Sequence, residues 1–182
     1  MVGQGPMKGF RVPGRSANDI RAVANRAASA LGITFPVDLG KLLESLTRFS
    51  IVLDVVPDKG SGLADNVEAC WLPETLTLML KESVYERACR NNPRELFTIF
   101  HELGHALLGH RRTMNREHPG AEIAIFEDSE WQANQFAAEM AMPVHIIRQQ
   151  NLYTPTQLMG AFGVSFLAAE KRLKWLRSKG QI

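Results

Sequence analysis

The sequence is short of cysteine, of net charge and of long apolar runs, and each shortage excludes a class of protein. Two cysteines in 182 residues, Cys70 and Cys89, form neither a CxxC metal motif nor a disulfide framework. A formal net charge of +2 is too small to indicate nucleic-acid binding by itself. No apolar run approaches the roughly 20 residues of a membrane span, and the N-terminus lacks the apolar segment of a signal peptide. We therefore expect a cytoplasmic protein that has no membrane partner.

The length and composition indicate one globular domain. Hydrophobic residues make up 45% of the chain and charged residues 22%, which is ordinary for a folded domain. Residues 1–15 contain several glycines and prolines and no acidic residue, so we predict that they form a flexible leader. The single domain then spans residues 16–182, with a helical segment over residues 143–182.

What the sequence does contain is the segment HELGH at residues 101–105. The Asn-Pro pair a few residues before it is typical of the first turn of a helix. In a helix, His101 and His105 lie on one face, one turn apart, where two imidazoles can bind a single zinc ion. Glu102 lies beside them and can take a proton from a metal-bound water. The spacing therefore predicts a zinc-dependent hydrolytic centre.

Apolar periodicity predicts helices on both sides of a small sheet. Ser16 is expected to cap a first helix and Pro36 to open a second. Three segments are typical of strands, SIVLDVV, VEACWLP and TLTLMLK, and the last two can pair as a hairpin around Pro73. Residues 75–81 are either a candidate edge strand or an ordinary core strand. Zinc peptidases hold an extended substrate against a sheet edge through backbone hydrogen bonds.

The segment from HELGH onwards is predicted to be mostly helical. A further helix is expected over SEWQANQFAAEMA, capped by Asp128 or Ser129. Two final helices are expected on either side of Gly163, with Thr154 and Ser165 as caps. The HELGH helix itself should turn a core-facing stripe inward, formed by Leu96, Ile99, Leu103 and Leu107.

A catalytic zinc usually has three protein ligands and leaves one position open for water. A third histidine in the pattern HExxHxxGxxH is excluded, because His110 follows His105 by five residues and a glycine immediately precedes it. A glutamate from the next predicted helix fits better, and Glu130 is the best placed. The alternatives that remain are His118, Glu127 and Asp128.

Two kinds of supporting group are expected around such a metal. Asn134 lies one helical turn after Glu130 and can accept a hydrogen bond from the far nitrogen of a zinc-bound histidine. A second electrophile often stabilises the oxyanion that forms during peptide hydrolysis. The sequence does not choose among four candidates for this role: His110, His118, Tyr85 and Tyr153.

HELGHALLGH followed by EWQANQFAAEMAMP resembles the ImmA/IrrE family of bacterial and phage metallopeptidases, with its recurring HExGH and ExxANxFAxxxxMP patterns. In that family the two histidines and the glutamate of ExxAN bind zinc, and the glutamate of HExGH is catalytic. The resemblance therefore implies that His101, His105 and Glu130 are zinc ligands and that Glu102 is catalytic. Many relatives carry an N-terminal helix-turn-helix domain, for which the predicted leader leaves no room.

The same resemblance implies a fold and a role. The expected fold is α+β: a mostly helical, zincin-like core of the gluzincin type, with a small three- or four-stranded sheet before the HELGH helix and a C-terminal helix pair. The implied activity is that of a zinc endopeptidase that cleaves one intracellular protein, a DNA-binding helix-turn-helix repressor of a stress or mobile-element programme. Mn²⁺ or Fe²⁺ can replace zinc in a site with two histidines and one carboxylate. The resemblance covers roughly residues 17–177 and is most specific over residues 94–143.

Two other classes of function remain open. The domain could sequester a partner protein without cutting it, although a purely structural zinc site usually has four ligands and is rich in cysteine. It could instead contact DNA through a basic C-terminal helix. In the alternative interpretation these basic residues are a solvated face, while Phe166, Leu173 and Trp175 pack inward. The basic residues are Lys171, Arg172, Lys174, Arg177 and Lys179.

Overall fold

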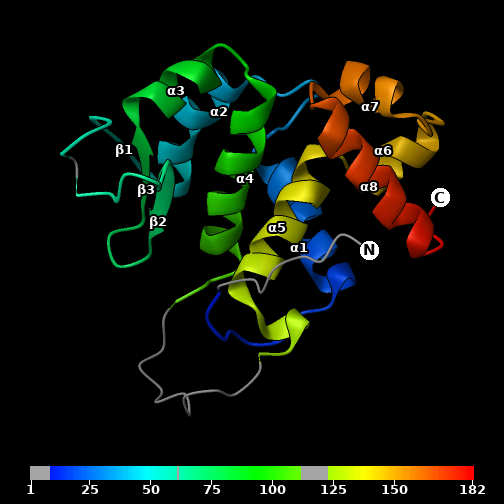
Figure 1. Ribbon diagram of the computed structural model, residues 1–182, viewed down its shortest axis with the longest axis horizontal. Helices are drawn as coiled ribbons and strands as arrows, with labels where there is room; N and C mark the ends of the chain where they lie inside the picture. Colours follow the sequence, from blue (N-terminus) through cyan, green and yellow to red (C-terminus); the bar gives the residue numbers. More distant parts are fainter. Residues whose placement is uncertain (1–8, 61, 112–122) are drawn as a thin grey trace.

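The computed structural model describes residues 9–60, 62–111 and 123–182. Helices form most of the molecule, and a small three-stranded sheet lies at one side, on the left in Figure 1. This is the predicted α+β class, with the sheet before the HELGH helix and a helix pair at the C-terminal end. In the part of the chain that is described, no helix combines the length and apolar character needed to cross a membrane. In chain order the elements are α1 (Ala17–Ala30), α2 (Leu39–Ser45), η1 (Leu46–Phe49), β1 (Val52–Val56), β2 (Ala69–Leu72), β3 (Thr77–Lys81), α3 (Glu82–Cys89), α4 (Pro93–Leu107), η2 (Ile125–Glu127), α5 (Ser129–Ala141), α6 (Val144–Gln149), α7 (Pro155–Phe162) and α8 (Phe166–Ser178).

Helices α4 and α5 lie side by side at the centre of the molecule (Figure 1). The sheet and α3 lie on one side of this pair, α6, α7 and α8 lie on the other, and α1 packs against α5. Helix α4 begins as predicted, because the Asn92 side chain accepts a hydrogen bond from the N–H of Arg94 at 3.0 Å and Pro93 occupies the first turn. The α4–α5 pair therefore lies between the sheet and the C-terminal helices.

The buried face of α4 follows the predicted stripe except at its end. Leu96, Ile99 and Leu103 are buried, as the periodicity predicts, whereas Leu107 is 40% exposed. Leu107 is the last residue of the helix, and the turn that follows places Leu108 in the interior instead. The end of a helix leaves the 3.6-residue period, so the stripe cannot be extended beyond it.

The sheet has the strand order β1–β3–β2, in which β1 is parallel and β2 is antiparallel to β3. The predicted hairpin of the second and third strands is confirmed. Of the two alternatives for residues 75–81, the core strand is correct and the candidate edge is not, because β1 pairs with the other side of β3 and Leu78 and Leu80 are fully buried. The edges are β1 and β2, and β2 is the edge that packs against α4.

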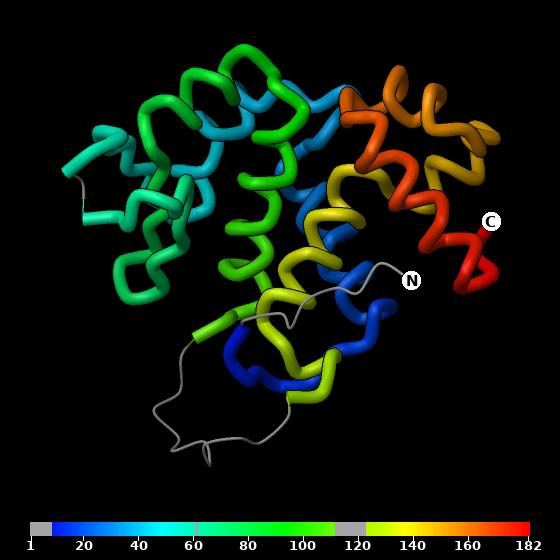
Figure 2. The backbone as a smooth tube through the Cα atoms, viewed as in Figure 1, coloured from blue at the N-terminus to red at the C-terminus, as the bar shows by residue number. Residues whose placement is uncertain are grey.

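The structure corrects the predicted flexible leader over residues 9–15. Arg11 forms an antiparallel bridge with Asp128, and the N–H of Val12 donates to the carbonyl oxygen of Glu127 at 2.8 Å. Val12 is 5% exposed. Figure 2 shows this segment running alongside the start of α5. The composition could not reveal this docking, since the backbone groups that hold the segment come from a distant part of the chain. The rest of the predicted leader lies outside the described residues.

The first two helices begin at side-chain caps. Ser16 and Asp19 form a capping box at the start of α1, as the predicted cap requires. Helix α2 begins at Leu39 rather than at Pro36, because the Asp38 side chain caps it by accepting a hydrogen bond from the N–H of Lys41 in the first turn. Both helices pack on the core through their apolar sides and carry no side chain of the site.

The C-terminal helix pair forms as predicted. Thr154 caps α7, Gly163 takes the left-handed conformation with φ of 68° between the helices, and Ser165 caps α8. Leu173 is buried, as predicted, but Phe166 is 53% exposed. Phe166 is the first residue of α8 and lies next to the turn, so its side chain does not reach the core.

Helix α8 also carries a buried charge that the basic-face interpretation did not foresee. Arg172 is 3% exposed and its guanidinium donates to both carboxylate oxygens of Glu139, at 3.1 and 2.7 Å. Arg21 from α1 pairs with the same carboxylate at 3.1 Å. Arg172 therefore ties α8 to α5 and is not available to DNA. The exposed basic residues in the helix and at its C-terminal cap are Lys171, Lys174, Arg177 and Lys179.

Candidate active site

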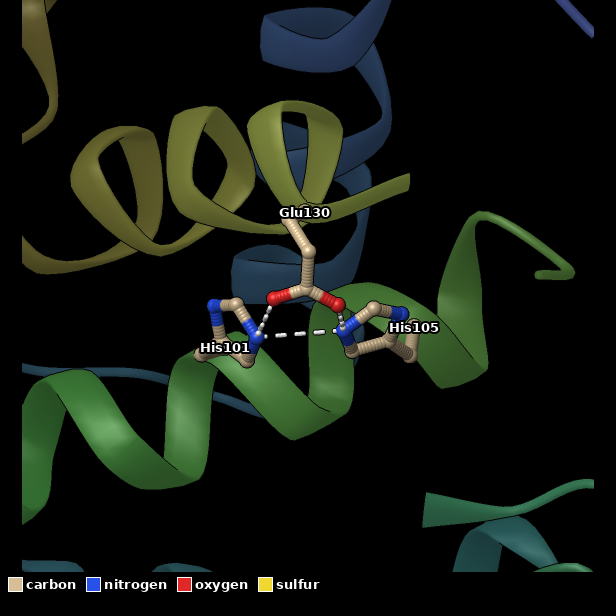
Figure 3. A group of neighbouring side chains, drawn as sticks. All are labelled: His101, His105 and Glu130. Carbon is tan, nitrogen blue, oxygen red and sulfur yellow. Dashed lines mark hydrogen bonds and ion pairs between the residues drawn. The ribbon is translucent and has the colours of Figure 1, made fainter. Parts of the chain in front are cut away.

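Two histidines of α4 and one glutamate of α5 converge on a single point. His101 and His105 lie one turn apart and point toward Glu130, which reaches down between them from the first turn of α5 (Figure 3). His101 Nε2 lies 3.1 Å from Glu130 Oε2, and His105 Nε2 lies 3.3 Å from Glu130 Oε1. The two Nε2 atoms are 3.1 Å apart. Within the described residues, these three side chains form a group that can hold a metal ion, since their ligand atoms lie within 4.8 Å of one another.

The ligand atoms of these three side chains present lone pairs to one another, an arrangement that a metal ion between them would stabilise. His101 Nδ1 lies 3.1 Å from Asn134 Oδ1, which is an acceptor, so the proton of a neutral His101 belongs on Nδ1. Its Nε2 then presents a lone pair to the oxygens of Glu130. Lone pairs that face each other repel unless a cation lies between them. Two imidazole nitrogens and one carboxylate are a ligand set of catalytic zinc sites, and the residues present therefore fit zinc.

The pKa values of these groups also favour positive charge at this point. Burial lowers the pKa of His101, but its hydrogen bond to Glu130 and the charges of Glu102 and Glu130 outweigh burial, so the pKa lies above its ordinary value. When His101 and His105 are protonated at Nε2, their hydrogen bonds to Glu130 hold the pKa of this carboxylate well below its ordinary value. The carboxylate is therefore ionised at neutral pH and attracts a cation.

The alternatives to Glu130 are engaged elsewhere. Asp128 caps α5, where its Oδ1 accepts a hydrogen bond from the N–H of Trp131 at 2.8 Å. Glu127 pairs with Arg11 at 3.4 Å. His118 lies outside the described residues. Of the acids proposed as a third ligand, only Glu130 points toward the two histidines.

Gly104, inside the HELGH segment, allows α4 and α5 to approach closely. A Cβ atom at this position would lie 3.1 Å from Ala133 Cα and 3.2 Å from Phe136 Cδ1. A side chain there would push the helices apart, because backbone atoms cannot move aside as a flexible side chain can. The glycine therefore sets the helix separation at which Glu130 reaches both histidines.

Glu102 is held by the edge of the sheet. Its Oε2 accepts a hydrogen bond from the N–H of Trp71 in β2 at 2.8 Å. The main-chain groups of Glu68 face β3, so in the alternating antiparallel pattern those of Trp71 point the other way, toward α4. Burial raises the pKa of Glu102 above its ordinary value, although the charges of His101 and His105 act in the opposite direction. A raised pKa makes this carboxylate a better base near neutral pH.

A groove of about 380 Å³ opens beside these side chains, and His101, Glu102 and Asn134 line it. It lies between the segment at residues 66–69 and α4. Glu68 in this wall is paired with Arg94 at 2.7 Å, so its charge is compensated. Apart from Glu68 and Glu102, the residues that line the groove carry no negative charge. Other lining residues are Asn66, Val67, Ala69, Phe97 and Thr98.

His110 does not occupy the position that an electrophile would need. It is 4% exposed, its Nδ1 lies 2.9 Å from His105 Nδ1, and its Nε2 lies 3.1 Å from Gln132 Oε1. Both ring nitrogens are therefore engaged on the side of His105 that faces away from Glu130. Burial lowers the pKa of His110 to about 4. The contact between His110 and Gln132 was not predicted from the sequence, because Gln132 belongs to no recognised motif.

The two tyrosines proposed as electrophiles make their described interactions elsewhere. Tyr85 lies on α3, where its hydrogen bond to Cys89 raises the pKa of the phenol. Tyr153 precedes α7, and its hydroxyl donates to Asn151 at 3.4 Å. Neither candidate is among the residues that line the groove. The structure thus brings together five of the predicted site residues: His101, Glu102, His105, Glu130 and Asn134.

Residues 63–174 match the family Peptidase M78, described as the IrrE N-terminal-like domain. The match covers more than half of the chain and includes α4 and α5. No curated protein matches the sequence. The chain is similar to a solved Mycobacterium tuberculosis transcriptional regulator, with 21% identity and a TM-score of 0.51, over 85% of this chain and 46% of that one. It spans about half the length of that regulator, and the likeness shows a common fold.

Proposed function

Because the chain belongs to the Peptidase M78 family, whose domain is described as IrrE N-terminal-like, we propose that it is a zinc-dependent endopeptidase. The family supports a peptidase acting on protein, and the ImmA/IrrE resemblance is confirmed. One observation carries the step from family to active enzyme. The three convergent donors of His101, His105 and Glu130 lie directly beside Glu102, a half-buried carboxylate held by a backbone N–H group.

His101, His105 and Glu130 are the residues that would hold the metal. When bound, zinc supplies Lewis acidity, which lowers the pKa of a coordinated water and favours negative charge on a peptide carbonyl oxygen. Asn134 accepts from the far nitrogen of His101 and so keeps the Nε2 atom of that ring aimed at the site. Mn²⁺ or Fe²⁺ could occupy the same set of two imidazoles and one carboxylate.

Glu102 is the general base and then the general acid. Its carboxylate takes a proton from the attacking water and later delivers that proton to the nitrogen of the leaving amine. The N–H of Trp71 holds Oε2, which leaves Oε1 to exchange the proton. The burial that raises the pKa of Glu102 serves both halves of this cycle, since the group must first gain and then lose a proton near neutral pH.

The open edge of β2 is the surface along which an extended substrate would lie. We assign this role to β2 and not to the candidate residues 75–81, because β3 is central and β2 is the edge next to α4. The main-chain groups of Ala69 point away from β3, as those of Trp71 do, and are placed to pair with a substrate backbone. Backbone pairing ignores side chains, so selectivity must come from the neighbouring groove and from the shape of the partner.

The substrate we propose is a DNA-binding helix-turn-helix repressor. This rests on the resemblance of the sequence motifs to the ImmA/IrrE family. The similar Mycobacterium tuberculosis chain is described as a transcriptional regulator, which supports a place in transcriptional control. Arg172 is buried, which weakens the alternative in which the C-terminal helix itself binds DNA.

The test is the replacement Glu102→Gln, which keeps an acceptor for the N–H of Trp71 but cannot take a proton. Co-expression with candidate repressors, followed by mass spectrometry of the fragments, identifies a substrate and its cleaved bond. With that substrate, Glu102→Gln should bind zinc nearly as tightly as the parent yet cut roughly 10²–10⁴-fold more slowly. Glu170→Gln, which changes an exposed carboxylate on α8, should cut normally. Full cleavage by Glu102→Gln would exclude the proposed chemistry, and full biological activity without cleavage would favour sequestration.

A further inference from the structure

The end of α4 folds a third histidine back against a proposed metal ligand. Gly109 has φ of 71°, and its N–H donates to the carbonyl oxygen of Ala106 at 3.2 Å. The N–H of His110 donates to the carbonyl oxygen of His105 at 3.0 Å. These two bonds form a Schellman motif, which brings the residue after the glycine next to the residue five positions earlier. The side chains of His110 and His105 consequently meet, with their Nδ1 atoms 2.9 Å apart.

Gln132 of α5 determines which nitrogen of His110 carries the proton. The Nε2 atom of Gln132 donates to the carbonyl oxygens of Pro13 and Phe126, at 2.9 and 2.7 Å. Carbonyl oxygens only accept hydrogen bonds, so the orientation of the amide is determined and its Oε1 must face His110. That oxygen lies 3.1 Å from His110 Nε2. Since Oε1 only accepts, His110 must carry its proton on Nε2.

The proton position of His110 in turn determines the proton position of His105. With its proton on Nε2, a neutral His110 presents a lone pair at Nδ1, and His105 must donate from its own Nδ1. The Nε2 atom of His105 then carries a lone pair, and this is the atom that lies 3.3 Å from Glu130 Oε1 and 3.1 Å from His101 Nε2. The opposite arrangement would direct an N–H group of His105 at the metal position and block coordination.

We propose that Gln132 and His110 are positioning residues that hold the proton of His105 on Nδ1 and leave Nε2 free to bind the metal. The proposal rests on the zinc site of the proposed function. It also gives the segment at residues 9–15 a role, because the carbonyl oxygen of Pro13 is one of the two groups that orient Gln132. Such outer partners set the tautomer and the ring orientation of metal-bound histidines.

The first test reads the proton positions directly in the unaltered protein. Long-range ¹H–¹⁵N spectra of ¹⁵N-histidine-labelled protein, with and without zinc, distinguish protonated from unprotonated ring nitrogens. We expect His110 to be neutral with its proton on Nε2 in both states, and zinc-loaded His105 to be protonated on Nδ1. A proton on Nδ1 of His110 would overturn the proposal, because His105 could then not donate to that atom. If the protein bound no zinc at all, the proposed function would fail. The spectrum of the metal-free protein would still show which ring nitrogens of His110 and His105 carry protons.

The second test measures zinc affinity by competition with a chromophoric chelator, independently of catalysis. His110→Leu removes the acceptor and should weaken zinc binding roughly 10–100-fold, whereas His110→Asn offers an amide oxygen and should restore most of the affinity. Gln132→Met should weaken binding in the same direction as His110→Leu. His145→Leu, at an exposed histidine of α6, is the matched control and should bind zinc normally. Thermal melting establishes that each variant is folded. Unchanged affinity in folded His110→Leu, or equal loss in the Leu and Asn variants, would overturn the proposal.

Discussion

Replacing Arg172 with leucine should lower the free energy of unfolding by about 3 kcal/mol, because it leaves a buried carboxylate without its main partner. The guanidinium makes two hydrogen bonds to Glu139 and two to the carbonyl oxygen of Met142, between 2.7 and 3.1 Å. Removal of one partner from a buried ion pair costs about 3–5 kcal/mol. The lower end applies here because Arg21 still contacts Glu139 at 3.1 Å.

Urea denaturation followed by circular dichroism measures this loss, with Lys171→Leu as the control. Lys171 is the neighbouring basic residue of α8 and is exposed, so its replacement should change stability by less than about 0.5 kcal/mol. In a thermal melt, Arg172→Leu should reduce Tm by about 6–12 °C for a domain of this size. Equal stability of the two variants would refute the conclusion that Arg172 is a structural residue.

The pH dependence of the loss provides a second check. Burial raises the pKa of Glu139, but the bonds and charges of Arg172 and Arg21 outweigh burial and hold the pKa below its ordinary value. In the parent protein this stabilisation is complete above the unfolded pKa and is lost as the pH falls through the folded pKa. In Arg172→Leu the burial of Glu139 favours its protonated form. Low pH therefore reduces the free-energy cost of burying this carboxyl group. The stability gap between the two proteins should therefore shrink toward about pH 4, and a constant gap would contradict the argument.

Three further predictions concern the site. Asn134→Ala should weaken zinc affinity or activity roughly 10–100-fold with the fold intact, and an unchanged chelator titration would make Asn134 a bystander. Gly104→Val should cost about 1–3 kcal/mol of stability and also weaken zinc binding, because it forces α4 away from Ala133; normal zinc affinity would show that helix separation does not govern the site. The purified zinc-loaded protein should leave casein largely intact while cutting its repressor at one or very few bonds, since backbone pairing along β2 alone gives no selectivity. Rapid casein digestion that is abolished by Glu102→Gln would confirm the chemistry and refute the narrow specificity.

The elements of the fold were predictable wherever neighbouring residues determine them. Ser16, Thr154 and Ser165 cap the helices at which they were expected, and Gly163 separates the last two. Strand pairing was less accessible. The hairpin of β2 and β3 follows from a short turn, but the parallel pairing of β1 with β3 joins segments that are distant in sequence. The sequence could not decide between an edge strand and a core strand for residues 75–81, because a strand's place in a sheet is set by non-local contacts.

The site divides in the same way. The positions of His101 and His105 follow from helical spacing, and the resemblance of EWQAN to a family motif indicates Glu130 from the sequence alone. The contact between Glu102 and the N–H of Trp71 was not predictable, since a backbone group has no sequence signature. For His110 only a local signal exists, the glycine before it, which predicts a helix end but not a partner.

The sequence by itself determined most of the helices and strands, although not α3, and it placed two imidazoles and a carboxylate on predictable helix faces. This is possible because side-chain periodicity and capping depend on residues within about one turn of each other. Only the tertiary structure decided what surrounds those groups. Pro13 and Gln132 meet although 119 positions separate them, and Arg172 is buried against Glu139 from another helix. Buried polar groups must find partners wherever packing places them, so those partners are a property of the folded chain and not of any local segment.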